Sequence, residues 1–447
     1  MNDYSIRPFC RKKIEDTYFL LLKKRIGEVS RVVQINEVGN TIVSLLESGV
    51  RTPLLFGELS KQYAISTDEA DEVQKDIEQF ISGLISFGLL FFKENNTPTF
   101  ESGTDSNPSS REFQIGMLER IYKKKGLLYK VFLEITYACN LRCKHCYRTE
   151  AVVDTTACNR QIHMDYKMIL DLLDELEEEG VVEVYITGGE AFLHPDIFSI
   201  LRYATKKNFL TTVLTNGNVL ANKDIVNRLI NFDLFDIRIS IYGDRKAHDN
   251  FTAHKGSFDK SMSALERVNR VLGIGTAVYV ATQESIGDID CMIKEFRRKG
   301  INFSINPVIT PTSEGALFPL KYRLSLKDYE KLCTEYPTLL NGSTCTAGIS
   351  RLRITPQGDV DGCEMLPDSK LGNLHMSNLA EILNSDRRIN FVEGFKNVQK
   401  EFPCSDCKKR PFCNVCPGAF YLETKCWGTV PKYRCGMTNA KMHSFGR

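Results

Sequence analysis

Three cysteines lie within eight residues of one another in the run from Cys139 to Cys146, which reads C-N-L-R-C-K-H-C. Thiolates hold iron–sulfur clusters and zinc ions, and both sites usually take four protein ligands. Three thiolates at C-x3-C-x2-C spacing are one ligand short of either site. In a four-iron cluster the missing ligand would leave one iron open to a small molecule, whereas a zinc ion would need His145 as its fourth ligand.

A pair of glycines and a carboxylate form a second short motif, Gly188-Gly189-Glu190. Glycine lets a ligand approach the backbone closely, and a carboxylate accepts hydrogen bonds from an ammonium group. Gly-Gly-Glu alone is a common turn. Its position at the end of a predicted strand, downstream of the three cysteines, favours a binding role. Asn216 and Ser240 end or nearly end two later predicted strands in the same way.

A second set of cysteines crowds the tail, residues 345–435. Its members are Cys345, Cys363, Cys404, Cys407, Cys413, Cys416, Cys426 and Cys435. Four of them could also form a zinc ribbon, namely Cys404, Cys407, Cys413 and Cys416. The tail has weak periodicity, so we expect it to need metal in order to fold.

Composition narrows the class of protein. The 447 residues are 42% apolar and 26% charged, as in ordinary globular proteins, and the net charge of +2 gives no whole-chain argument for nucleic acid. The runs 123–125 and 408–410 are basic but short, and we expect them to be solvated faces. The start has no apolar signal segment, and no stretch is long enough to span a bilayer. We therefore expect a cytoplasmic protein. In such a protein, 15 cysteines indicate metal or redox chemistry more than a disulfide framework.

Hydrophobic periodicity predicts a first domain over residues 1–95. Strands are expected at 18–24, 30–35 and 89–93, and helices at 37–47, 54–63 and 68–88. Asn36 is the expected N-cap of the first helix. Residues 96–127 are expected to form a linker, because 95–112 are rich in Asn, Ser, Thr, Gly and Pro.

Strands and helices then alternate, which predicts an α/β fold built on a parallel sheet. The expected strands are 130–136, 181–187, 210–215, 235–241, 275–281 and 301–308. Helices are expected at 165–179 and 257–272, the second with Ser257 as its N-cap. Six repeats are fewer than the eight of a closed barrel. Sites on such sheets lie at the carboxyl ends of the strands, where the first cysteine loop falls.

These motifs resemble the radical S-adenosylmethionine (SAM) enzymes over residues 128–320. The resemblance implies an open six-stranded (βα)6 partial TIM barrel, with a [4Fe-4S] cluster on Cys139, Cys143 and Cys146 whose open iron chelates SAM. It places His145 beside the adenine. It also assigns SAM contacts to Gly188, Gly189, Glu190, Asn216 and Ser240. One departure is Thr252, which stands where many relatives carry Arg, so an ion pair expected there is in doubt.

The tail, residues 321–447, resembles the SPASM auxiliary-cluster domain of peptide-modifying radical enzymes. The resemblance implies two auxiliary [4Fe-4S] clusters, one on Cys404, Cys407, Cys413 and Cys435. The other takes Cys345, Cys363 and Cys416. That second cluster is one ligand short, so Cys426 or a substrate thiolate would complete it. The last pair, Cys413 and Cys416, is separated by two residues where three are usual.

Residues 1–95 resemble a winged helix, and also the small peptide-recognition domain related to the pyrroloquinoline-quinone biosynthesis chaperone. The resemblance rests on Gln34-Ile35-Asn36, residues 48–52 and residues 80–90. It implies that this domain binds the leader of a precursor peptide. We expect neither nucleic acid nor a membrane to be a partner of this protein. A DNA-binding winged helix is the alternative reading of the same pattern.

The whole chain thus resembles maturases of ribosomally synthesised peptides. The run Cys345-Thr346-Ala347-Gly348 and the Cys413 to Cys416 spacing favour the sactipeptide type, which links cysteine sulfur to carbon as a thioether. In this family one electron, from a donor such as flavodoxin or ferredoxin, splits SAM into methionine and a 5′-deoxyadenosyl radical, which abstracts hydrogen from the peptide. The alternatives are carbon–carbon crosslinking, another oxidative peptide modification, a formylglycine-type maturase, and a non-enzymatic metal sensor that binds DNA.

Overall fold

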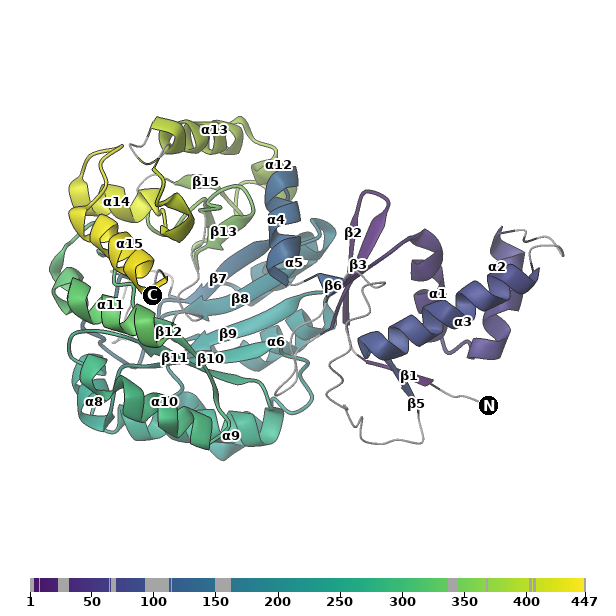
Figure 1. Cartoon of the computed structure of the whole chain (residues 1–447), viewed down its shortest axis with the longest axis horizontal. Coiled ribbons are helices and arrows are strands. Elements are labelled where there is room, and N and C mark those ends of the chain that lie inside the picture. Colours follow the sequence, from purple (N-terminus) through teal and green to yellow (C-terminus); the bar gives the residue numbers. More distant parts are fainter. Residues whose placement is uncertain are drawn as a thin grey trace. The chain divides into compact units, whose positions relative to one another are not determined.

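The computed structural model forms two compact units, Met1–Ile121 and Tyr122–Arg447 (Figure 1). It describes residues 4–7, 9–22, 32–63, 65, 70–92, 112–113, 115–148, 162–336, 345–366, 369–401, 404 and 407–445. The two units are described separately below.

The N-terminal unit combines two small antiparallel sheets with three helices. One sheet pairs β1 (Tyr4–Ile6) with β5 (Leu90–Phe92), and the other has the order β2 (Phe9–Ile14), β3 (Thr17–Leu22), β4 (Val32–Ile35), β6 (Glu112–Phe113). The helices are α1 (Glu37–Glu47), α2 (Leu55–Tyr63) and α3 (Ala70–Phe87), with a 3-10 turn at Thr52–Leu54. The predicted helices are therefore confirmed, as is the cap, since Asn36 Oδ1 accepts a hydrogen bond from Gly39 N at 2.8 Å.

Two features of this unit differ from the sequence expectations. The strand β2 was not predicted because it reads Phe-Cys-Arg-Lys-Lys-Ile, yet Cys10 and Lys12 are buried against the sheet. The predicted linker, residues 96–127, contains the strand β6 and the helix α4 (Ile115–Lys125), so its second part is not a linker. Most of the polar stretch 95–112 lies outside the described residues.

The second unit is built on one nine-stranded sheet, ordered β12-β11-β10-β9-β8-β7-β13-β14-β15. The six barrel strands are all parallel and confirm the predicted α/β repeats to within two residues at each end: β7 (Lys130–Thr136), β8 (Glu183–Gly188), β9 (Leu210–Thr215), β10 (Asp236–Ile241), β11 (Gly275–Val280) and β12 (Asn302–Asn306).

The tail continues this sheet instead of starting a separate one. The strand β13 (Arg351–Ile354) pairs in parallel with β7, and β14 (Asp359–Asp361) and β15 (Lys370–Asn373) follow it as antiparallel strands. The boundary predicted at residues 320 and 321 therefore runs through one compact unit. In Figure 1 the tail helices α12 (Leu379–Leu383) and α13 (Asp386–Glu401) lie beside β15, the edge strand at this end of the sheet.

Helices cover the sheet and leave its strand ends to carry the site. They are α5 (Tyr166–Glu178), α6 (Ile197–Lys206), α7 (Lys223–Asn227), α8 (Arg245–Thr252), α9 (Ser257–Leu272), α10 (Ile289–Arg298), α11 (Leu326–Glu335), α12 (Leu379–Leu383), α13 (Asp386–Glu401), α14 (Pro417–Thr424) and α15 (Lys432–Phe445). Their apolar faces join one core with the inner strand residues, and Ile169 on α5, Leu133 on β7 and Val213 on β9 are fully buried in it. Among the described residues, no helix is long and apolar enough to cross a membrane.

The predicted cap of α9 is wrong by one residue. Gly256, at φ 80°, takes the N-cap position, and Ser257 is the first helical residue. The carboxylate of Asp249 accepts hydrogen bonds from Gly256 N at 2.6 Å and Phe258 N at 2.8 Å, so it satisfies the helix start from outside. The Ser257 hydroxyl is thereby free to pair with His248 Nε2 at 3.2 Å.

Candidate active site

The first cysteine motif lies on the loop that follows β7 and is tied to the end of α8. Lys144 N donates to Phe251 O at 2.9 Å, and Arg142 N donates to Thr252 O at 3.2 Å. A further backbone bond, Cys146 N to Cys143 O at 3.1 Å, turns the loop back on itself. The backbone therefore holds the loop in place without any need for the three cysteine side chains.

Thr252 resolves the doubt about the family's arginine. The residue is fully buried, and its hydroxyl donates to His248 O at 2.9 Å. The neighbouring carboxylate, Asp249, takes its hydrogen bonds from the backbone at Gly256 and Phe258. Asp249 is thus satisfied by backbone N–H groups without an arginine at position 252.

The three thiols of this loop repel one another when ionised. Burial raises the pKa of Cys139 to about 11, and the charges of Glu190 and Cys146 add to the shift. Burial raises the pKa of Cys143 further, with the charges of Cys146 and Cys139 adding to it. Positively charged iron would remove this penalty, because thiolates are the form that binds metal. The residues present therefore fit a cluster.

A single zinc ion fits less well. Among the described residues, no three His, Cys, Asp or Glu side chains are placed to hold one metal ion. The ligands of a zinc ion all lie about 2.0–2.3 Å from one centre, whereas each thiolate of a cluster binds a different iron. His145 packs instead against the rings of Tyr242 and Phe251, at centroid distances of 5.0 and 4.9 Å. Burial lowers the pKa of His145 to about 4, so the ring is neutral at pH 7.

The two glycines of the second motif are required by the neighbouring strand. A Cβ at Gly188, which has φ 143°, would lie 2.2 Å from Thr136 O, and one at Gly189 would lie 2.4 Å from Ala138 O. Gly189 N and Glu190 N donate to the same two carbonyls, each at 2.8 Å. The glycines therefore bring the ends of β7 and β8 together, directly below the cysteine loop. The sequence had suggested close approach of a ligand, and the contact of these glycines with SAM stays a prediction.

Glu190 is buried and joins three strand ends. Its Oε1 accepts from Thr215 Oγ1 at 2.7 Å and Phe192 N at 3.1 Å, and its Oε2 accepts from Asn216 N at 2.8 Å. Burial raises the pKa of this carboxyl, while the three donors oppose the shift. Because a carboxylate has about four acceptor positions, one further donor can bind.

Two residues that the sequence reasoning missed complete the site. Asn140, next to the first cysteine, accepts from Asn216 Nδ2 at 2.7 Å and so links the loop to β9. The hydroxyl of Tyr242 lies near the Cys143 thiol and the Ser240 hydroxyl, close enough that each shifts the pKa of its neighbour. Asn140 lies inside the cysteine run and could have been noticed there. Tyr242 offers no sequence signal beyond its place after a strand.

A buried ion network connects this loop to the tail strand. Glu134 on β7, fully buried, pairs with Arg148 at the end of the loop and with Arg353 on β13 through bonds of 2.6 and 2.9 Å. Asp361 on β14 is 3.3 Å from the same Arg353. The two arginines hold the pKa of Glu134 below its usual range despite its burial. The network fixes the cysteine loop and the start of the tail to one strand.

The tail cysteines gather in two groups. The charge of Cys416 acts on Cys345, and the charges of both act on Cys363. Burial raises the pKa of Cys345 to about 12 and is also the largest cause of the raised pKa of Cys363 and Cys416, so the three sulfur atoms face the interior. Cys404, Cys407, Cys413 and Cys435 form the second group, in which Cys435 is exposed.

This grouping agrees with the predicted division of the tail cysteines into two sets. That each set binds an iron–sulfur cluster stays a prediction. Cys416 belongs to the group of Cys345 and Cys363, so the structure does not assemble the zinc ribbon that was considered for Cys404, Cys407, Cys413 and Cys416. Cys426 is exposed, and its thiol bonds Trp427 O at 3.5 Å. It is not among the charges that shift the three inward-facing thiols.

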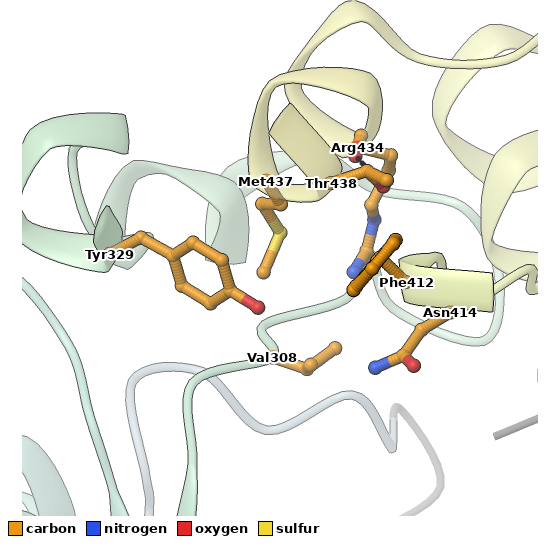
Figure 2. A pocket seen from close by; sticks show the side chains of 7 residues that line it. All are labelled: Val308, Tyr329, Phe412, Asn414, Arg434, Met437 and Thr438. Atoms are coloured by element: carbon orange, nitrogen blue, oxygen red, sulfur yellow. Dashed lines mark hydrogen bonds between the residues drawn. The ribbon is translucent and has the colours of Figure 1, made fainter. Parts of the chain in front are cut away.

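A pocket lies between the carboxyl end of β12 and the tail (Figure 2). Arg434 reaches into it with a guanidinium that is almost fully buried and bonds Glu423 at 3.2 Å. Its Nη2 has no hydrogen-bond partner among the described residues. Arg323 pairs with the same Glu423 at 2.5 Å, which leaves the triad with one positive charge in excess. Such a pocket suits a carbonyl or carboxylate oxygen.

Fold and site together define an α/β protein of the radical SAM class with a cysteine-rich tail. Residues 133–311 match the Radical SAM superfamily, and residues 345–408 match SPASM, an iron–sulfur cluster-binding domain. Residues 133–311 thus form a radical SAM domain, and residues 345–408 form a SPASM domain. These domains imply a [4Fe-4S] cluster, auxiliary clusters and SAM, as predicted.

Particular relatives refine this assignment. The chain is homologous to the antilisterial bacteriocin subtilosin biosynthesis protein AlbA of Bacillus subtilis, with 24% identity over 311 residues, 64% of this chain and 66% of that protein. It is 31% identical over 185 residues to the mycofactocin maturase MftC of Mycobacterium ulcerans, 41% of this chain and 48% of MftC. The matches thus span about half to two thirds of these relatives.

A solved structure extends the likeness in fold. Streptococcus suis SuiB bound to its precursor peptide SuiA superposes with a TM-score of 0.58 at 16% identity, over 95% of this chain and 99% of SuiB. At this identity the likeness concerns the fold alone. It confirms the partial-barrel architecture.

Proposed function

We propose that this chain is a radical SAM maturase that forms thioether crosslinks between a cysteine sulfur and a carbon atom of a ribosomally synthesised peptide. The observation that carries the proposal is the presence of two incomplete three-cysteine groups in one compact unit. Cys139, Cys143 and Cys146 stand at the strand ends, and Cys345, Cys363 and Cys416 lie in the tail.

The first group supplies the radical chemistry. When loaded, a cluster with SAM on its open iron provides a carbon-centred radical that can take hydrogen from an unactivated carbon. The chain's own residues would position the SAM: Glu190 has an acceptor position left for its ammonium group, and Asn216 and Asn140 fix that carboxylate relative to the loop. His145, neutral and packed on aromatic rings, offers an apolar edge to the adenine.

The second group supports the choice of thioether formation. Three inward-facing thiols leave one position free, and a peptide cysteine is a natural fourth ligand because thiolates bind iron well. Arg351 interacts with the same three thiols and pairs with Glu364. Its positive charge would help to balance the negative charge that a fourth thiolate adds to this group. The exposed Cys426 is a poorer candidate for that position.

The N-terminal unit would bind the leader of the peptide. Its four-stranded sheet ends in β2, an edge strand, and an extended peptide can add to such an edge. The homology to AlbA and MftC, both named for peptide-derived products or maturation, agrees with a peptide substrate. A flavodoxin or ferredoxin would supply electrons, in the cytoplasm.

SAM cleavage tests the enzymatic part of the proposal. The reconstituted protein, reduced with dithionite under anaerobic conditions, should release 5′-deoxyadenosine from SAM. The Cys345→Ala variant should bind less iron yet still cleave SAM, because it leaves the first group intact. Absence of 5′-deoxyadenosine from the unaltered protein would refute the enzyme reading and favour the metal sensor.

The mass of the modified peptide tests the thioether part. Co-expression with the short peptide encoded beside this gene should remove two hydrogens per crosslinked cysteine and block those thiols to alkylation. A product with the same mass loss but free thiols would point to carbon–carbon crosslinking. Conversion of a cysteine to formylglycine would indicate the sulfatase-type reaction.

A further inference from the structure

Three adjacent cations at the second tail group have no role in the proposed function. Lys408, Lys409 and Arg410 are all exposed. They lie in the turn that joins Cys407 to Cys413, and backbone bonds fix it at both ends. Arg410 N donates to Cys407 O at 2.9 Å, and Cys413 N donates to Arg410 O at 3.0 Å. We call these three residues the basic rim.

The charges of the basic rim reach the thiols beside it. Arg410 interacts electrostatically with Cys404, and Lys409 interacts with Cys435. Lys409 Nζ also donates to Asn439 Oδ1 at 2.6 Å, which anchors its side chain on α15, the helix that carries Cys435. The rim is thus attached to the two segments that hold this group of cysteines.

The same group contains a cysteine that is exposed to solvent, Cys435. Cys435 is exposed, whereas the sulfur atoms of Cys345 and Cys363 face inward. A partner protein can therefore come closer to the group of Cys404, Cys407, Cys413 and Cys435. The rim is also a local feature, since the whole chain has a net charge of only +2. The segment 404–413 contains three cations and one anion, Asp406, which lies outside the described residues. Its formal net charge is therefore +2.

We propose that the basic rim is the docking surface for a small acidic electron-carrier protein that exchanges single electrons with this chain. The proposal rests on the proposed function, which needs an electron donor. In each transfer the reduced carrier loses one electron and this chain gains it. Opposite charges steer such partners together and fix their register, and redox partners typically bind through small, weak interfaces.

The test compares two reductants and a direct measure of binding. In the full-length, cluster-loaded protein, Lys408→Gln, Lys409→Gln and Arg410→Gln are combined. Calorimetry with an acidic flavodoxin should show a Kd raised about tenfold and a weaker dependence on salt. Flavodoxin-driven SAM cleavage should show a raised KM for the carrier. Dithionite-driven cleavage should change by less than about twofold, because a small reductant needs no docking surface.

A matched control separates docking from overall charge. Lys123, Lys124 and Lys125 on α4 are changed to Gln together, which removes the same number of cations. An equal loss of flavodoxin affinity in this control, or an unchanged Kd in the rim variant, overturns the proposal. If the rim variant loses iron, the binding measurement is repeated with Lys408→Glu alone. We expect a raised Kd for flavodoxin in this variant, and an unchanged Kd would overturn the proposal. Failure of the proposed function is distinguishable, since the unaltered protein would then not cleave SAM with dithionite.

Discussion

At the scale of single residues, Glu190 connects the site more than any other side chain. It receives donors from β9 and from the turn after β8, and it lies below the cysteine loop. A buried carboxylate with a raised pKa is stabilised only while these donors stay in place. Its value to the site is therefore positional as well as electrostatic.

Replacing Glu190 by Gln should weaken SAM binding about tenfold or more, which corresponds to the 1.5–3 kcal/mol of a hydrogen bond to a charged group. The amide also turns a donor toward one of the three existing donors. Calorimetric titration of SAM into the reconstituted variant measures the effect. Thr215→Val is the control, because it removes one donor to Glu190 and keeps the charge. Equal affinities in Glu190→Gln and the unaltered protein would contradict the assignment.

His248 makes stability depend on pH. Its Nδ1 accepts from Tyr242 N at 3.2 Å, which requires a neutral ring, and burial lowers the pKa of His248 to about 4. The unfolded chain binds this proton near pH 6.5, so stability is full above that pH and falls as the pH drops toward 4. At pH 5 the loss from this residue is about 2 kcal/mol. Urea unfolding at pH 7 and pH 5 should show a smaller difference in His248→Gln than in the unaltered protein.

At the scale of elements, the site depends on how two neighbouring strands end. The end of β8 and the turn after it carry Gly188 and Gly189 because the carbonyls of Thr136 and Ala138 leave no space for a Cβ. The first cysteine, Cys139, follows three residues after the end of β7. Strand pairing thus sets the position of the loop before any ligand binds.

Gly189→Ala should displace the cysteine loop, since its Cβ would meet Ala138 O at 2.4 Å. We expect a destabilisation of about 1–3 kcal/mol from overpacking, and a loss of iron from the first group. Thermal unfolding and iron analysis measure the two effects. Gly287→Ala provides the control, because its Cβ would meet no atom within 4 Å. Full iron content in Gly189→Ala would show that the loop tolerates the shift.

At the scale of the whole second unit, the tail and the barrel share one sheet. The strand β13 extends the barrel beside β7, and Glu134 with its two arginines connects both to the cysteine loop. Burial makes such a network sensitive to the loss of one member, because the remaining charges stay unpaired in a region of low dielectric. The first cysteine loop and the start of the tail are therefore both attached to β7.

Glu134→Gln should destabilise the unit by about 3–5 kcal/mol, since two buried arginines lose their counter-charge. Glu295→Gln is a matched control, because Glu295 also faces two cations, Arg298 and Lys299, but at the surface. Such exposed pairs contribute about 0–1 kcal/mol. Denaturant unfolding of both variants should separate them clearly, and equal midpoints would contradict the role of the network.

The sequence by itself determined the chemistry and the parallel core. The cysteine spacings and the six apolar strands are local patterns, so both were visible without coordinates, and the strand ends agree to within two residues. It also indicated the two sets of tail cysteines. It missed β2, whose Lys12 is buried, because burial of a lysine depends on distant neighbours.

Only the tertiary structure decided how these parts meet. The pairing of β13 with β7, the bond from Asn140 to Asn216, and the contact of Tyr242 with Cys143 each join residues or elements from different parts of the site. It also showed that the two glycines make room for the carbonyls of Thr136 and Ala138, whereas their contact with SAM stays a prediction. The reason is physical: periodicity reports which side of an element is buried, whereas the partner that buries it is chosen by packing between segments far apart in the chain.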